Sequence, residues 1–190
     1  ARTYEAWDNR IEVQYLSLHG LKTFRTESTQ MAVISPGELF HIIKADKEWL
    51  LNWYFVQDYG ITLFGPSPHT FIDPISKEEF IRAVVHHAHQ WPRWMPNTRH
   101  SQPYQSYAIL TMCRSRYTYK HGLQVSKKQA ADWAQKELPR SATLIQSARE
   151  WRLTARLPGP IDHEADHPLA SLTTSTPSFA ARCVRSMCRT

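Results

Sequence analysis

The sequence lacks any run of about 18 apolar residues, the length that crosses the hydrocarbon core of a bilayer, so no membrane-spanning helix is predicted. It also lacks an initiator Met. The first residues, Ala1 to Glu5, carry no apolar core of a signal peptide either, so we expect the chain to be the rear part of a longer protein. With 42% apolar and 12% aromatic residues, the chain is not disordered as a whole.

Cysteine is scarce, since only Cys113, Cys183 and Cys188 occur. An odd number at this spacing excludes the disulfide framework of a small secreted protein. The cysteines also lack companion ligands at zinc-site spacing, so no metal site is predicted from them. We therefore expect a reducing, cytoplasmic setting.

Basic residues exceed acidic ones. The chain has 23 lysines and arginines against 17 aspartates and glutamates, which gives a net charge of +6 and a pI near 9.3. This excess favours an anionic partner. A nucleotide, a nucleic acid and an acidic surface all remain compatible with it.

The composition changes near residue 153. No lysine follows Lys136, and the sequence after Leu153 is rich in Ser, Thr, Pro and Ala without hydrophobic periodicity. We predict that residues 154–190 form a disordered or aberrant tail. The part before it is predicted to divide into a strand-and-loop segment, 1–34, and a helical domain, 35–153.

Periodicity predicts one strand near the start. Ile11, Val13 and Tyr15 alternate with more polar neighbours, which is typical of a half-buried strand that ends before Gly20. Residues 21–34 are predicted to be a loop.

Cap signals then predict a series of helices. Ser35-Pro36-Gly37-Glu38 combines an N-cap serine, a proline at the first helical position and a glutamate three residues after the cap, so a helix is predicted from there to Gly60. The same kind of signal predicts four more helices, from Ser76 to about Gln90, from Pro103 to about His121, from Ser126 and from Ser141. The predicted fold class is mainly α, a bundle of about five helices preceded by one strand.

A series of motifs runs through the second half of the chain: Leu110-Thr111-Met112-Cys113-Arg114, Tyr117, Gly122, Ser126-Lys127, Ala130-Ala131-Asp132-Trp133-Ala134 and Leu138-Pro139. In order and spacing, these residues resemble the C-terminal helical domain of the streptomycin/spectinomycin adenylyltransferases, an aminoglycoside nucleotidyltransferase-like family. Further upstream, Gly65-Pro66 and Phe71-Ile72-Asp73-Pro74 resemble a turn of that family, and Arg10-Ile11-Glu12-Val13 resembles the last strand of its nucleotidyltransferase sheet. The resemblance covers about residues 10 to 153.

The resemblance implies a two-domain enzyme that transfers an adenylyl group from ATP to a hydroxyl of an aminoglycoside-like or other small acceptor. ATP and Mg²⁺ are the expected cofactors of the full-length family, held by a Gly-Ser turn and an Asp-x-Asp pair in its N-terminal domain. Neither motif occurs in these 190 residues. Residues 1–34 are then a remnant of the nucleotidyltransferase domain, and we expect the chain to be inactive alone because Mg²⁺ needs clustered carboxylates.

Three residues match the family's positions for chemistry and nucleotide binding. Glu12 falls where the family has the carboxylate that takes the proton of the attacking hydroxyl, although a solvated glutamate on an edge strand is the alternative. Lys127 falls at the triphosphate-contacting lysine, at the first helical position after Ser126, where backbone N–H groups also favour an anion. Arg152 falls near a further nucleotide contact. A surface lysine is the alternative for Lys127, and Lys128 is an equally good candidate for the same contact; near Arg152 the family commonly has a tyrosine.

The acceptor side departs from the family pattern. Bacterial members place an acid just ahead of the Leu-Thr-x-x-Arg helix, where this chain has Gln102 to Tyr107. Tyr104, Tyr107 and Trp91 are the candidate acceptor contacts, with packing as the alternative for Trp91. Neither tyrosine neutralises a cationic aminoglycoside.

Two further features have structural interpretations. Arg114 is predicted to be a buried pairing partner for Asp132. His86 and His89 share a helical face, but no third ligand at a credible position completes a zinc site, so a solvated or partly packed face is the prediction.

Alternatives to the enzyme remain open from the sequence. A helical module that binds nucleotide or nucleic acid fits the charge and the seven tryptophans, although no recognised nucleic-acid motif is present. A protein-interaction segment is the third possibility, because an unpaired strand over Ile11 to Ser17 favours pairing with another edge. No membrane partner is expected, and the sequence does not decide the oligomeric state.

Overall fold

The computed structural model describes residues 11–35, 39–98, 101–154 and 183, and of residues 95–97 and 154 the backbone alone. The chain divides into two compact units, 1–83 and 84–190. The predicted domain boundaries at residues 34 and 153 stay predictions. The predicted tail, 154–190, lies outside the described residues except for Thr154 and Cys183. No helix in the described ranges is long and apolar enough to cross a membrane.

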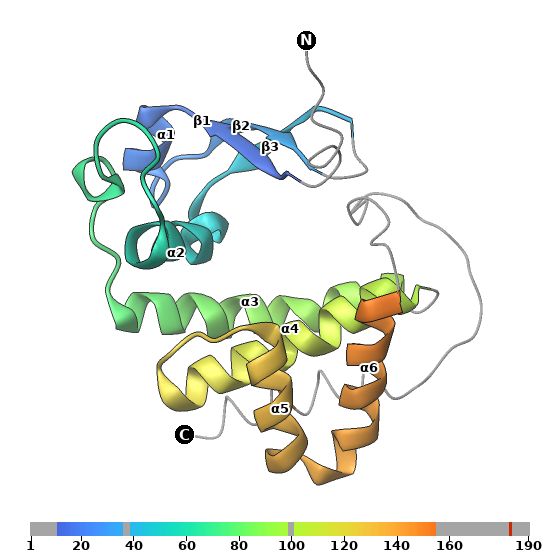
Figure 1. Cartoon of the computed structure of the whole chain (residues 1–190). Coiled ribbons are helices and arrows are strands. Elements are labelled where there is room, and N and C mark those ends of the chain that lie inside the picture. Colours follow the sequence, from blue (N-terminus) through green and yellow to red (C-terminus); the bar gives the residue numbers. More distant parts are fainter. Residues whose placement is uncertain (1–10, 36–38, 99–100, 155–182, 184–190) are drawn as a thin grey trace. The chain divides into compact units, whose positions relative to one another are not determined.

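The first unit contains a three-stranded antiparallel sheet in the order β1-β2-β3 (Figure 1). Its strands are β1 (Val13–Leu16), β2 (Thr29–Ile34) and β3 (His41–Ala45). Tyr15 lies opposite Ala32, which in turn lies opposite Ile42. The strand predicted near the start is therefore present, and two further strands pair beside it.

The prediction of a loop over residues 21–34 is wrong. Helix α1 (Leu18–Thr23), whose first turn is capped by the Ser17 side chain, ends within this stretch. The central strand β2 follows it. The prediction of a helix that begins at Ser35 is also wrong, because strand β3 occupies residues 41–45. The branched Ile42 and Ile43 suit a strand, and their pairing with β2 outweighs the cap signal before them.

The helix over this region begins later than predicted. Asp46 caps a 3₁₀ turn, η1 (Lys47–Trp49), by accepting a hydrogen bond from the Glu48 N–H at 3.0 Å. Helix α2 (Leu50–Tyr59) follows directly and lies on one side of the sheet in Figure 1. A short turn, η2 (Pro68–Thr70), precedes helix α3 (Lys77–Thr98).

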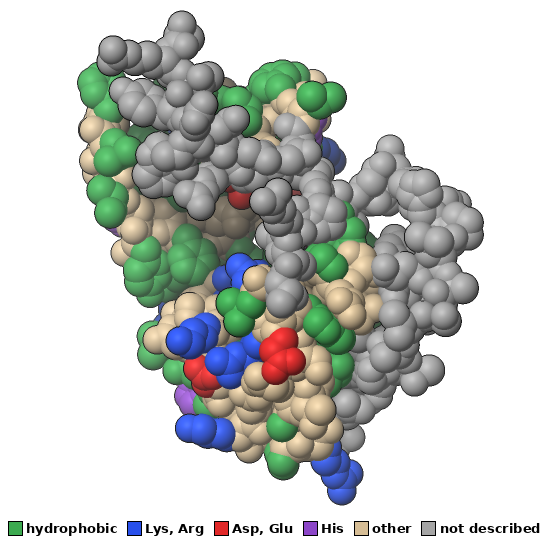
Figure 2. All heavy atoms as spheres, turned by 45° about the vertical axis from the view of Figure 1, so that its right-hand side comes forward, with side chains coloured by type: hydrophobic (Ala, Val, Ile, Leu, Met, Phe, Trp, Pro, Cys, Tyr) green, Lys and Arg blue, Asp and Glu red, His purple; other side chains and the backbone are tan. Residues whose placement is uncertain are grey.

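The core of the first unit forms on one face of its sheet. Alternation along the strands buries Met31, Val33 and Ala45 on that face, and α2 contributes Leu50 and Trp53. The other face leaves apolar side chains exposed, namely Tyr15, Ile34, Phe40 and Ile42. Figure 2 accordingly shows hydrophobic side chains at the surface of this part of the chain.

The second unit is helical. After the end of α3 come α4 (Gln102–His121), α5 (Lys127–Glu137), the 3₁₀ turn η3 (Pro139–Ser141) and α6 (Ala142–Thr154). Helix α4 packs against both α5 and α6, and its apolar side is buried almost completely. The core consists mainly of small and medium side chains: Ala88, Ala108, Ile109, Leu110, Met112, Ala130, Ala131, Ala134, Ile145 and Ala148.

The start and end signals of these helices act as predicted. Gly122 ends α4 in the left-handed conformation, at φ 63°, and its N–H donates to the Thr118 carbonyl. Helix α3 starts at the predicted place but runs to Thr98, beyond the predicted end near Gln90. The mainly α fold class is confirmed.

Candidate functional site

The start of α5 fixes the position of Lys127. The Ser126 hydroxyl accepts a hydrogen bond from the Gln129 N–H at 3.2 Å, and the Gln129 side chain accepts one from the Ser126 N–H at 3.1 Å. This reciprocal cap holds the first turn of the helix. Lys127, the first residue of α5, reaches over α4 with its Nζ 3.5 Å from the centre of the Tyr107 ring. The lysine is therefore held by a cation–π contact and is not a free surface side chain.

Three cations gather around this contact. Burial, together with the positive charges of Arg114 and Arg152, lowers the pKa of Lys127 to about 7. Burial also lowers the pKa of Arg114, and Arg152 acts in the same direction. We call Arg114, Lys127 and Arg152 the cationic cluster. Its members come from α4, α5 and α6, so only the folded helical unit brings them together.

The cationic cluster has no carboxylate to balance it among the described residues, since none lies within 4.0 Å of its three side chains. The two acids of α5 pair elsewhere. Asp132 lies 2.7 Å from Arg149, and Glu137 lies 2.7 Å from Lys120. Figure 2 shows such acidic and basic side chains side by side on the helical part.

The predicted pairing of Arg114 with Asp132 is therefore wrong. Asp132 is half-buried on α5 and is held by Arg149 of α6, one of the elements that α5 packs against. Arg114 is left as part of the cationic cluster. Arg114 is the member of the cationic cluster that the sequence interpretation did not count among the site residues, and its signal was an arginine directly after the apolar Met112 and Cys113 of α4.

Aromatic side chains adjoin the cationic cluster. The Trp91 and Tyr107 rings lie 5.8 Å apart, centre to centre, and the Trp91 and Trp94 rings are equally close. Trp91 donates from Nε1 to Nε2 of His87 at 3.1 Å, and only 2% of its surface is exposed. Tyr107 is 37% exposed, so its ring is accessible to a ligand, whereas the buried Trp91 ring packs within the protein.

The structure brings together four of the six predicted site residues: Trp91, Tyr107, Lys127 and Arg152. Tyr104 lies on α4 one turn before Tyr107 and is half-buried. Glu12 belongs to the other compact unit, just before β1, and is exposed. Its carboxylate accepts a hydrogen bond from the Gln14 side chain at 3.2 Å. The roles predicted for all six residues stay predictions.

The described residues do not fit a magnesium or zinc site. Among the described residues, no group of three His, Cys, Asp or Glu side chains could hold a metal ion. His86 contacts Gln90 across 3.2 Å, and His87 accepts from Trp91. The charge of the cationic cluster favours a nearby anion, whereas the described residues provide no set of oxygen ligands for a divalent cation.

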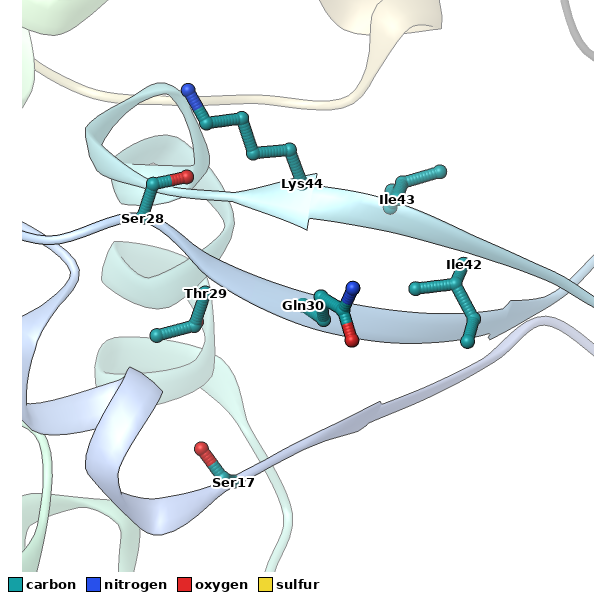
Figure 3. A pocket seen from close by; sticks show the side chains of 7 residues that line it. All are labelled: Ser17, Ser28, Thr29, Gln30, Ile42, Ile43 and Lys44. Atoms are coloured by element: carbon teal, nitrogen blue, oxygen red, sulfur yellow. The ribbon is translucent and has the colours of Figure 1, made fainter.

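A separate hollow lies in the first unit. Its volume is about 750 Å³, and it opens beside β2 and β3 with the lining shown in Figure 3: Ser17, Ser28, Thr29, Gln30, Ile42, Ile43 and Lys44. Lys44 is the single charged group in this lining, and its ammonium is mostly exposed, 3.8 Å from Asp46. The described part of this lining contains no acid, histidine or cysteine.

Comparison with known proteins agrees with the geometry of the helical unit. No curated protein matches the chain. A family model for the C-terminal domain of aminoglycoside adenylyltransferase matches residues 70–165, half of the chain. The match spans α3 to α6, the helices that carry the cationic cluster and the aromatic rings beside it. This chain belongs to the aminoglycoside adenylyltransferase family through that C-terminal domain.

Proposed function

We propose that this chain is the nucleotide-contacting helical portion of an adenylyltransferase-like protein, and that the cationic cluster receives the triphosphate of ATP. The observation that carries the proposal is the convergence of Arg114, Lys127 and Arg152 without a carboxylate within 4.0 Å among the described residues. Like charges held close together repel one another. A bound polyphosphate supplies the missing negative charge, and guanidinium groups pair well with phosphate oxygens.

The reaction proposed for the complete enzyme is adenylyl transfer. A hydroxyl oxygen of the acceptor attacks the α-phosphorus of ATP, pyrophosphate leaves, and the hydroxyl proton passes to a carboxylate. In this chain Glu12 is the proposed base. It is exposed just before β1, so its carboxylate is accessible to the hydroxyl of an acceptor.

On the acceptor side, the proposed contacts are Tyr104, Tyr107 and Trp91. Tyr107 presents a partly exposed ring next to Lys127, which suits stacking against a flat or sugar-like surface. Trp91 lies beside that ring, 5.8 Å away centre to centre, and contributes by packing. The acceptor is a small molecule with a hydroxyl group.

The proposal is tested by separating binding from turnover. The 190-residue chain is expected to bind ATP in equilibrium dialysis with labelled nucleotide. With ATP, Mg²⁺ and streptomycin or spectinomycin, it is expected to give no adenylylated product by mass spectrometry, because the Gly-Ser and Asp-x-Asp motifs are absent. Turnover by the chain alone contradicts the assignment as a non-catalytic portion, and absence of ATP binding contradicts the phosphate site.

The pH dependence of ATP binding gives a further prediction. The pKa of Lys127 is about 7 in the free protein, so the lysine loses its charge as the pH rises through 7. A bound phosphate favours the charged form, so binding above pH 7 requires proton uptake. We expect the affinity for ATP to be about tenfold lower at pH 8 than at pH 6, by proton linkage to one group.

The matched control for this pH effect is Lys127→Arg, whose guanidinium stays charged over the whole range. In that variant the dissociation constant for ATP is expected to vary less than threefold between pH 6 and 8. This is roughly the change expected from titration of the phosphate groups of ATP itself. Equal pH profiles of the two proteins would show that Lys127 does not set the dependence.

A further inference from the structure

A long stretch around α3 and α4 lacks negative charge. The 52 residues from Phe80 to Ala131 contain eight lysines and arginines, five histidines and no aspartate or glutamate. The cationic cluster uses two of these basic residues, and Arg116 and Lys120 contact Glu137 of α5. The remaining basic side chains therefore include groups that neither the proposed ATP site nor an ion pair of the described residues accounts for.

Four of the basic and histidine side chains share one face of α3. Residues 82, 86, 89 and 93 recur at steps of four, three and four, which places them in one line along a helix. All four are exposed: Arg82, His86, His89 and Arg93. We call this set the α3 stripe. The opposite line of the same helix is buried and packs into the protein through Phe80, Val84, Ala88 and Trp91.

No acidic residue of the described chain forms an ion pair with either arginine of the α3 stripe. Arg82 lies near enough to Glu79 to lower the pKa of that carboxyl, but Glu79 is bound more closely by Arg25, at 2.8 Å. Neither Arg82 nor Arg93 forms an ion pair within 4.0 Å among the described residues. Both guanidinium groups stay charged at any physiological pH.

We infer that the α3 stripe is a binding surface for the phosphodiester backbone of a nucleic acid. From Arg82 to Arg93 the stripe runs about 16 Å at the rise of an α-helix. Phosphates repeat regularly along a nucleic-acid strand, so a stripe of this length faces several of them in succession. Two permanent cations with two imidazoles between them match a chain of regularly repeated anions better than a single small anion.

The chemistry of the side chains supports the same partner. Arginine contacts phosphate oxygens through two parallel N–H groups, and imidazoles donate hydrogen bonds to them. The line lacks an apolar side chain that would anchor a folded protein partner. The backbone of nucleic acids requires no base-specific contact, so the stripe is expected to bind without strong sequence preference.

The test measures binding of fluorescein-labelled single-stranded RNA and DNA of mixed sequence to the full 190-residue chain by fluorescence anisotropy. Binding is expected with a dissociation constant of about 10⁻⁴ to 10⁻⁶ M at physiological salt, typical of backbone recognition. The variant Arg82→Gln/Arg93→Gln is expected to bind about twentyfold more weakly near 0.1 M salt. Its plot of log affinity against log salt is expected to be shallower by about 1.4, since each phosphate contact on a single strand contributes about 0.7.

The matched control is Lys136→Gln/Arg140→Gln, which removes the same charge from exposed positions of α5 and η3. It is expected to bind within about twofold of the unsubstituted chain if each phosphate contact belongs to the α3 stripe. An equal loss in both double variants, with circular dichroism showing both folded, would overturn the inference, since net charge alone would then explain binding.

Competitors distinguish this surface from other anionic partners and from the proposed ATP site. Poly-glutamate and phosphatidylserine vesicles are expected to displace the nucleic acid poorly, and saturating ATP is expected to leave it bound. Lys127→Met is likewise expected to retain RNA and DNA binding. Displacement by ATP would place the nucleic acid on the cationic cluster and overturn the inference, as would equal displacement by poly-glutamate or vesicles.

Discussion

Lys127→Met is expected to weaken ATP binding by about ten- to a hundredfold and, at the same time, to raise the melting temperature of the free chain. The first effect follows from the loss of a charge-assisted hydrogen bond to phosphate, which contributes about 1.5 to 3 kcal/mol. The second follows because burial and two neighbouring arginines make the charged lysine unfavourable in the folded chain. Methionine keeps most of the aliphatic stem but carries no charge.

The sign of the stability effect depends on pH. Below pH 7, Lys127 is charged in both the folded and the unfolded chain, and the folded chain carries the whole cost of that charge. Between pH 7 and the ordinary pKa of lysine the folded chain binds fewer protons than the unfolded one, so its stability rises with pH. The gain from Lys127→Met is therefore expected to be largest at pH 6, as measured by thermal unfolding followed by circular dichroism.

Lys128→Met supplies the control for both effects. Lys128 is the next residue of α5 and is exposed, so its substitution removes the same charge beside the site without relieving a buried cation. Its melting temperature is expected to stay close to that of the unsubstituted chain, and its affinity for ATP to fall less than threefold, roughly the effect of one screened surface charge. A stabilised Lys127→Met chain that binds ATP normally would remove Lys127 from the phosphate site.

The helical unit was largely predictable because its signals are local. Ser126 and Gln129 form a capping box within one turn, and Gly122 ends α4 by its own conformational freedom. Each signal determines a helix end without reference to distant residues. Lys127 followed from the family resemblance, and its cap explains why it projects where it does.

The first unit was less predictable because its structure depends on pairing across the chain. The cap signal at Ser35 is local, whereas β3 forms because Ile42 and Ile43 meet β2 some eleven residues earlier, opposite Ala32 and Met31. Strand pairing of this kind leaves only weak marks in the sequence, since the same apolar residues also suit a buried helix.

Arg114 shows the limit of sequence reasoning at the site itself. Asp132 lay at a plausible distance in the sequence, but α6 brings Arg149 to that carboxylate instead. Only the packing of α4, α5 and α6 decides which cation meets which acid. The same packing leaves Arg114 beside Lys127 and turns an expected structural residue into a proposed phosphate contact.

Trp91→Ala is expected to destabilise the chain by about 3 to 5 kcal/mol, the range for deleting a large aromatic side chain from a core. Trp91 is 2% exposed, contacts the rings of Trp94 and Tyr107, and donates a hydrogen bond to His87. Its removal leaves a cavity beside α4 and removes the hydrogen bond to His87. Urea unfolding monitored by circular dichroism measures the loss.

Trp91→Phe separates this packing role from direct contact with an acceptor. Phenylalanine keeps most of the apolar volume but loses the hydrogen bond to His87, which contributes about 0.5 to 1.5 kcal/mol. The variant is expected to lose less than half as much stability as Trp91→Ala and to bind ATP as the unsubstituted chain does. If Trp91→Ala were instead to unfold at the normal urea concentration, the tryptophan would not be part of the core.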